Sequence, residues 1–256
     1  MLELPGGQPT CVSIPITRPV PAPLRSVLVR RVFSLTGLVL LGAFLVVHVA
    51  VNARALKGDA AFASVADALQ RIPALPLVEA MFIFLPLVVH GAVGLWLLVT
   101  RTPLGSSSPY PRAVRIAMRA TGAVALAFLA MHLSEFRFRT PGARMGGTEL
   151  GTLVAADLSS TAIGVPWRGA AYLIGTGCVT FHFAAGLWGF LAALPWGEAA
   201  VRRKWTAWGA GAVGAAIWVT LVNVVVFQAT GARLIGEPPS NSDATGPCSK
   251  TGAGGP

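Results

Sequence analysis

Five long apolar stretches constrain the fold of this 256-residue sequence more than any other feature. A helix needs roughly 20 apolar residues to cross a hydrocarbon core of about 30 Å. Within that core only helices and closed barrels satisfy all of their backbone polar groups. Each stretch is long enough for one helical span, and they cover residues 32–53, 76–100, 113–134, 169–194 and 205–228. We therefore predict an all-α integral membrane bundle of five transmembrane helices.

Composition supports the membrane environment and narrows the partners. Charged residues make up 12% of the chain, whereas soluble domains average about 25%. The net charge of +10 arises largely from basic residues near the ends of the apolar stretches, where they act as topology signals. We therefore expect contact with membrane lipid and no nucleic-acid partner. The cysteines Cys11, Cys178 and Cys248 form no CxxC or CxxCH motif, so neither a disulfide framework nor c-type haem attachment is indicated.

The apolar stretches divide the chain into three parts. Residues 1–29 form a proline-rich N-terminal arm without the apolar core of a signal peptide. Residues 30–230 form the transmembrane domain, and residues 231–256 form a flexible tail rich in Gly and Pro. Residues 1–31, which precede the first apolar stretch, share one side with the connections 101–119 and 196–204, and this side holds eleven of the twenty basic residues and two of the ten acids. The positive-inside rule then predicts a cytoplasmic N-terminus and an outside C-terminus.

The chain has four histidines, one in each of the first four apolar stretches: His48, His90, His132 and His182. An ionisable side chain inside a bilayer is costly and by default marks a functional site. One such histidine could simply hydrogen-bond a neighbouring carbonyl. Four of them, one on each helix, favour a shared role in holding a cofactor.

The first and second helices resemble the third and fourth. HGAVGLW begins at His90 and HFAAGLW begins at His182, while the pattern Phe-Leu-x-x-His ends at both His48 and His132. At a rise of about 1.5 Å per residue, His48 and His132 lie near the outer ends of their helices. The other two histidines lie deeper toward the cytoplasm. A duplicated helical hairpin therefore predicts that His48 faces His132 and that His90 faces His182.

Paired imidazoles at two depths suit two six-coordinate haem irons, an arrangement that favours electron transfer. A zinc site would need four ligands converging at one depth. A planar macrocycle between helices also needs close backbone approach. Gly94 and Gly186 lie one turn beyond the deeper histidines, and Gly37 and Gly122 return to the same level; ordinary helix packing explains these glycines equally well. We predict two haem b groups.

These segments resemble a known family, the di-haem cytochrome b membrane anchor of succinate dehydrogenases and fumarate reductases in its five-helix, single-subunit form. The resemblance covers residues 30–228. It rests on RRVFSLTGLVL and FLVVHVAVN, then VEAMFIFLPLVVHGAVGLWLL, RATGAVALAFLAMHLSEFR and FHFAAGLWGF. It implies that His90 and His182 hold the haem proximal to an iron–sulfur subunit, and that His48 and His132 hold the distal haem.

The resemblance also implies partners and a location. A flavoprotein subunit would oxidise succinate, and an iron–sulfur subunit would dock on the cytoplasmic face of this anchor. Electrons would pass through both haems to a membrane quinone, with menaquinone favoured over ubiquinone. The chain would lie in a bacterial inner (cytoplasmic) membrane and would not be catalytic alone. Some relatives carry a glutamate beside the inner histidine of the fourth helix, where this chain has Thr180, so a proton path that depends on that acid is not expected.

Further candidates lie at the edges of the predicted haem sites. Haem propionates need charged or hydroxyl donors, which Arg31, Ser34 and Arg119 could supply on the inner side and Arg137 on the outer side. Each arginine could equally be a topology charge among lipid headgroups. Glu79, near the outer end of the second helix, could exchange protons with a quinone or cap that helix.

Two other functions stay open from the residues alone. A different membrane cytochrome b, such as the anchor of a formate dehydrogenase or a stand-alone quinone reductase, would hold the same haems with another soluble partner. A haem-free transporter would use the histidines for protons or metal. Co-purifying subunits would identify the first alternative, and a colourless protein would indicate the second.

Overall fold

The computed structural model describes residues 33–100, 110–139, 146–162, 164, 166–193 and 199–235. Within these residues, five helices are long and apolar enough to cross a membrane: Leu35–Lys57, Leu75–Thr100, Arg112–Phe136, Trp167–Leu191 and Arg203–Thr230. The prediction of an all-α bundle with five spans is confirmed. The N-terminal arm and the tail from residue 236 onward lie outside the described residues.

The first two spans are each built from several helical segments. The first contains the π-helical turn η1 (Leu35–Leu40), α2 (Leu41–Asn52) and the 3-10 turn η2 (Ala53–Lys57), and the second contains α4 (Leu75–Glu79), the π-helical turn η3 (Ala80–Phe84) and α5 (Leu85–Thr100). Pro86 lies two residues after the end of η3 and has no N–H to donate to the carbonyl of Phe82, which lies within η3. The irregular turn η3 therefore lies where the helical hydrogen-bond ladder is interrupted.

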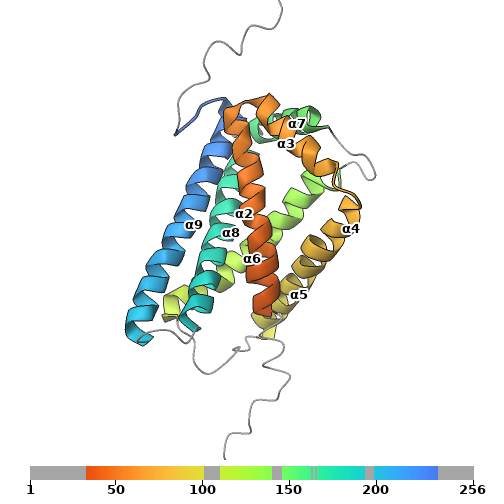
Figure 1. Cartoon of the computed structure of the whole chain (residues 1–256). Coiled ribbons are helices and arrows are strands. Elements are labelled where there is room, and N and C mark those ends of the chain that lie inside the picture. Colours follow the sequence, from red (N-terminus) through yellow and green to blue (C-terminus); the bar gives the residue numbers. More distant parts are fainter. Residues whose placement is uncertain are drawn as a thin grey trace, which may run out of the picture.

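The other three spans are continuous α-helices, α6 (Arg112–Phe136), α8 (Trp167–Ala193) and α9 (Ala199–Thr230). α8 packs along α9 and crosses α6, while α5 lies on the far side of the bundle from α9 (Figure 1). Small residues let α8 and α9 approach closely, because a Cβ on Gly214 would lie 2.6 Å from that of Ala184. α8 is therefore the central helix of the second half of the molecule.

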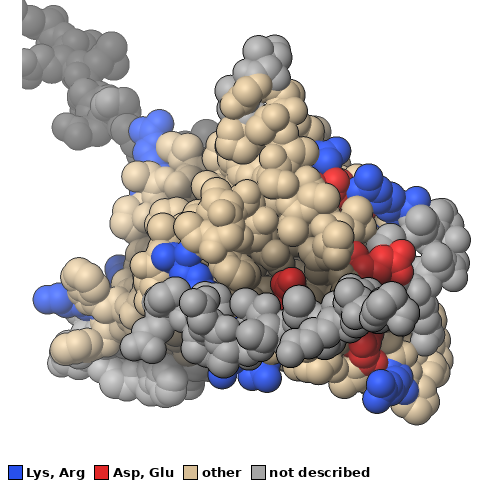
Figure 2. All heavy atoms as spheres, turned by 90° about the horizontal axis from the view of Figure 1, so that it is seen from above, with Lys and Arg blue, Asp and Glu red and all other residues tan. Residues whose placement is uncertain are grey.

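Two connections between spans form a helical cap at one end of the bundle, outside the five apolar stretches. α3 (Asp59–Gln70) and α7 (Gly147–Ser159) lie against each other there (Figure 1). The backbone N–H of Gly147 donates to Oδ1 of Asp67 at 2.7 Å, and a Cβ on Gly147 would collide with the backbone of Ala63. Acidic and basic side chains lie close together at the rim of this end (Figure 2).

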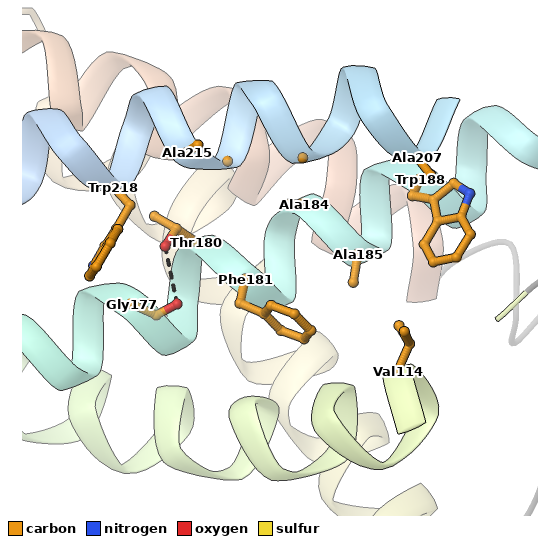
Figure 3. Close-up of a pocket in the computed structure, with 12 residues that line it drawn as sticks. Val114, Gly177, Thr180, Phe181, Ala184, Ala185, Trp188, Ala207, Ala215 and Trp218 are labelled. Carbon is orange, nitrogen blue, oxygen red and sulfur yellow. Dashed lines mark hydrogen bonds between the residues drawn. The ribbon is translucent and has the colours of Figure 1, made fainter. Parts of the chain in front are cut away.

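The long helices turn large apolar side chains outward. Val88, Val99 and Ile116 are 65%, 73% and 58% exposed, a pattern that a water-facing surface rarely tolerates. Residues of α6, α8 and α9 line a shallow groove of about 430 Å³, with Trp188 and Trp218 at its two ends (Figure 3). These surfaces suit contact with lipid chains.

Candidate functional site

The histidines pair at two levels, and the pair nearer the α3–α7 cap is called the outer pair and the other the inner pair. The outer pair joins α2 to α6. His48 lies near the end of α2 and His132 near the end of α6, and their ring centroids are 5.7 Å apart with the ring planes 86° from parallel. Both side chains are largely removed from the surface. Phenylalanines one turn earlier, Phe44 and Phe128, lie beside the respective rings. The structure thus brings together two histidines that are 84 residues apart in the sequence.

The inner pair joins α5 to α8. The rings of His90 and His182 have centroids 6.2 Å apart and planes 82° from parallel. Nδ1 of His90 lies 3.2 Å from the carbonyl oxygen of Phe33, and Nδ1 of His182 lies 3.1 Å from that of Met118. A carbonyl can only accept, so each Nδ1 carries the proton and each Nε2 is left with a free lone pair.

Each of the two inner histidine rings packs closely against a glycine. A Cβ on Gly37 would collide with the ring of His90, and a Cβ on Gly122 would lie 2.9 Å from Cε1 of His182. Each glycine lies four residues after the carbonyl that its histidine contacts, one helical turn along the same face. The two halves of the bundle therefore hold the inner histidines by equivalent backbone positions.

The π-helical turn η1 keeps the two halves in register. Eleven residues separate Gly37 from His48, but ten separate Gly122 from His132. A π-turn bonds i to i+5 and so accommodates one more residue than an α-turn. η1 covers Leu35–Leu40, within which Gly37 lies. The extra residue is thus absorbed there, and both histidines of the first hairpin still reach their partners.

The two pairs fit the axial ligands of haem iron. An imidazole–metal bond is about 2 Å long, so two rings on opposite sides of one metal ion have centroids about 6 Å apart. Both measured separations match that distance. Among the described residues no three His, Cys, Asp or Glu side chains group together as a metal site, so the donor sets are histidine pairs. Carbonyls that hold the inner Nδ1 atoms would leave Nε2 directed at the metal, as ligating histidines require.

The ring of His132 lies in a polar and aromatic cluster that sequence reasoning missed. Its Nδ1 is 3.1 Å from the hydroxyl of Tyr172, and the same hydroxyl donates to Oε2 of Glu135 at 2.8 Å. Phe128 and Phe136 flank the ring. Glu135 lies three positions after His132 on α6, and this spacing is the sequence signal that could have placed Glu135 near the ring. Tyr172 comes from another helix, and its contact depends on how α8 crosses α6.

The remaining predicted glycines differ from Gly37 and Gly122. A Cβ on Gly94 would lie 3.8 Å from the ring of Phe33, and a Cβ on Gly186 would have no heavy atom within 4 Å. Neither glycine is required for contact between the described parts of the protein. Both positions leave space beside the inner histidines.

The predicted polar candidates lie at the two ends of the bundle. Glu79 forms an ion pair with Arg137 at 2.8 Å, which joins the second span to the end of α6. Ser34 and Arg119 are exposed at the opposite end, and Arg31 lies outside the described residues. Arg119 continues a stripe with two other arginines of α6 around a shallow hollow of about 260 Å³.

Two hydroxyl groups near the inner pair bond to backbone carbonyls. Thr180 is buried, and its hydroxyl donates to the carbonyls of Thr176 and Gly177 at 2.8 and 3.1 Å (Figure 3). Tyr110 donates to the carbonyl of Ala185 at 2.8 Å, and burial raises the pKa of Tyr110 to about 12. Neither group is therefore an ionised donor or acceptor near neutral pH.

The five apolar spans define a multi-pass membrane protein, and four of these spans bring two histidine pairs face to face. The sequence is 31% identical over 176 residues to the succinate dehydrogenase cytochrome b558 subunit of Bacillus subtilis (strain 168), which is 68% of this chain and 82% of that protein. The chain belongs to the family of succinate dehydrogenase cytochrome b subunits. No protein-family model and no solved structure matches the sequence.

Proposed function

We propose that this chain is the membrane anchor and di-haem b electron-transfer subunit of a succinate:quinone oxidoreductase. The supporting observation is the pair of histidine pairs, separated along the bundle and each spaced for two axial ligands. When bound, haem b supplies a one-electron carrier at each of the two levels. The similarity to a succinate dehydrogenase cytochrome b558 subunit supports haem b as the cofactor.

The protein's own residues would bind and orient the two cofactors. In the proposed inner site His90 and His182 are the ligands, and the carbonyls of Phe33 and Met118 hold their rings. In the proposed outer site His48 and His132 are the ligands. Rings that are held in place before binding lose less side-chain entropy when the cofactor binds, which favours affinity.

The partner subunits would bind at the end of the bundle opposite the α3–α7 cap. We propose that this end faces the cytoplasm and receives the iron–sulfur subunit, which in turn carries the flavoprotein subunit. The exposed arginines Arg112, Arg115 and Arg119 support this orientation. Arg119, Ser34 and Arg31 are the proposed donors to the propionates of the inner haem, and Gly94 and Gly186 leave space beside it.

The quinone would exchange electrons near the capped, outer end. Glu79 is the proposed acid on that side, and its ion pair with Arg137 places it beside the end of α6. Menaquinone is the proposed quinone. Carriers at two levels provide a path across the membrane, and such a path is useful when the quinone has a low potential. The multi-pass chain would lie in the bacterial inner membrane.

Three experiments test this function. A pyridine haemochrome assay on the wild-type protein should give two b haems per chain, and a reduced-minus-oxidised spectrum should show both reducible. Affinity purification through this chain should recover a flavoprotein and an iron–sulfur protein with succinate:quinone reductase activity. A well-folded, colourless chain would overturn the haem assignment, and recovery of a different dehydrogenase would overturn the partner assignment.

A further inference from the structure

His132 differs from the inner histidines in the group that contacts its Nδ1. For His90 and His182 that group is a backbone carbonyl. For His132 it is the hydroxyl of Tyr172, at 3.1 Å. For His48 the structure gives no such ring partner among its described residues. One histidine of the outer pair is therefore held by a side chain that is itself held by other polar groups.

The polarity of this contact follows from the groups on either side of it. Tyr172 is 6% exposed, and its hydroxyl lies 2.8 Å from Oε2 of Glu135. A carboxylate only accepts, so the tyrosine O–H donates to Glu135 and its lone pair faces Nδ1 of His132. That nitrogen must then carry the proton, which leaves Nε2 free as a metal ligand.

Glu135 and a second acid, Asp157, share contacts with the same arginine, Arg168. Arg168 lies 3.3 Å from Oε1 of Glu135 and 2.8 Å from Oδ1 of Asp157. Arg139 contacts the other oxygen of Asp157 at 2.6 Å. The two acids are 11% and 8% exposed in their side chains, and Arg139 is 46% exposed. The buried acids are thus linked to two arginines, one of which reaches the surface.

The first half of the repeat lacks this arrangement. Glu135 follows His132 by three residues, and the residue three after His48 is Val51. Tyr172 precedes His182 by ten residues, and residues 75–89, which precede His90 in the second span, contain no tyrosine. The first half of the repeat therefore packs its helices without this polar pair. The polar pair is therefore an addition to one ligand of one site.

We infer that Tyr172 and Glu135 are positioning residues that orient His132 and strengthen it as an axial ligand of the outer haem. This inference rests on the outer bis-histidine site proposed above. A hydroxyl that donates to a carboxylate becomes a stronger acceptor, because hydrogen bonds in a chain polarise one another. The Nδ1–H bond of His132 is then polarised toward Tyr172, which raises the basicity of Nε2. A more basic ligand stabilises ferric over ferrous iron, so the polar pair lowers the midpoint potential of this one haem.

The test compares Tyr172→Phe and Glu135→Gln with the wild-type complex by redox titration and by electron paramagnetic resonance of the low-spin ferric haems. Both variants should raise the potential of one haem and alter its ferric signal, while the other haem stays unchanged. We expect about a tenfold change in the ferric-to-ferrous ratio at fixed ambient potential, which corresponds to about 59 mV for one electron. Tyr110→Phe is the matched control, because it removes a tyrosine hydroxyl that contacts a carbonyl and not a histidine.

The outcomes separate this inference from the proposed function. Two haems in the variants with both potentials unchanged would overturn the inference and leave the function intact. A wild-type protein without the outer haem would overturn the function itself. If Tyr172→Phe does not accumulate, Glu135→Gln decides alone, since it keeps the tyrosine hydroxyl and removes only the charge behind it. An equal shift of both haems would also overturn the inference, because it indicates a general change of the bundle.

Discussion

The inner and outer histidine pairs are built in different ways on one repeated frame. Both inner rings contact a backbone carbonyl and a glycine four residues later. In the outer pair, by contrast, His132 of the second hairpin has a side-chain hydrogen-bond partner, Tyr172, and His48 has none among the described residues. Backbone contacts depend on helix packing and little on sequence, so both halves of the repeat keep them. Side-chain contacts need particular residues at particular positions, and only one half has acquired them.

The difference extends to the surroundings of each pair. The outer pair lies beneath the α3–α7 cap, where Asp157 of α7 is nearly buried and joined to two arginines. The inner pair lies toward the end where exposed arginines gather on α6. Buried ionic groups need partners to remain charged, and the cap supplies them. The outer end is therefore the better place in this fold for a charged group that acts on a ligand.

Loss of one ligand from each pair is the most direct way to break the comparison. His90→Ala and His48→Ala should each reduce the haem content from two b haems per chain to one, because a single imidazole cannot fill both axial positions. The pyridine haemochrome assay measures the content, and redox titration identifies the remaining haem. Removal of the same haem by both changes would contradict the assignment of one haem to each pair.

The cap can be separated from the outer pair by removing its buried acid. Asp157→Ala should lower the free energy of unfolding by about 1–3 kcal/mol, because it removes a buried carboxylate that pairs with Arg139 and Arg168. Thermal denaturation of the detergent-solubilised protein measures the loss. The inner haem should keep its potential, and a shift in that potential would show that the two ends are not independent.

The contact between a glycine and each inner histidine can be tested by adding one carbon atom to the glycine. Gly37→Ala places a Cβ against the ring of His90 and should destabilise the inner site by about 1–3 kcal/mol, the usual cost of overpacking. Gly122→Ala should act in the same direction on His182, with less overlap at 2.9 Å. Gly209→Ala on α9 is the control, since its Cβ would meet no atom within 4 Å. Equal effects of all three changes on haem retention would argue against a role for the Gly37 and Gly122 contacts in holding the inner histidines.

The exposed ion pair at the outer end should have the smallest effect on stability. Glu79→Gln removes the charge that faces Arg137, whose side chain is 43% exposed. Surface pairs of this kind contribute about 0–1 kcal/mol, so the melting temperature should change little compared with Asp157→Ala. A loss as large as that of Asp157→Ala would show that Glu79 does more than join two helix ends.

Helix-level features were predictable because they depend on composition and spacing. A run of some 20 apolar residues satisfies its own backbone only as a helix in lipid, so all five spans could be located in advance. The positions of the four histidines on four different helices could be read in the same way. The facing of His48 with His132 and of His90 with His182, which the repeat predicted, is the arrangement that the structure has.

Contacts between helices were decided by the tertiary structure. The sequence contains Tyr172 and Glu135, but their meeting at His132 requires a particular crossing of α6 and α8. The cap of α3 and α7 likewise formed from segments whose short helices gave no long apolar signal. By itself the sequence determined a five-helix membrane chain with a histidine on each of four helices, since hydrophobicity acts locally along each helix. Only the folded bundle decided which groups stand behind each histidine, because those partners come from other helices and depend on packing.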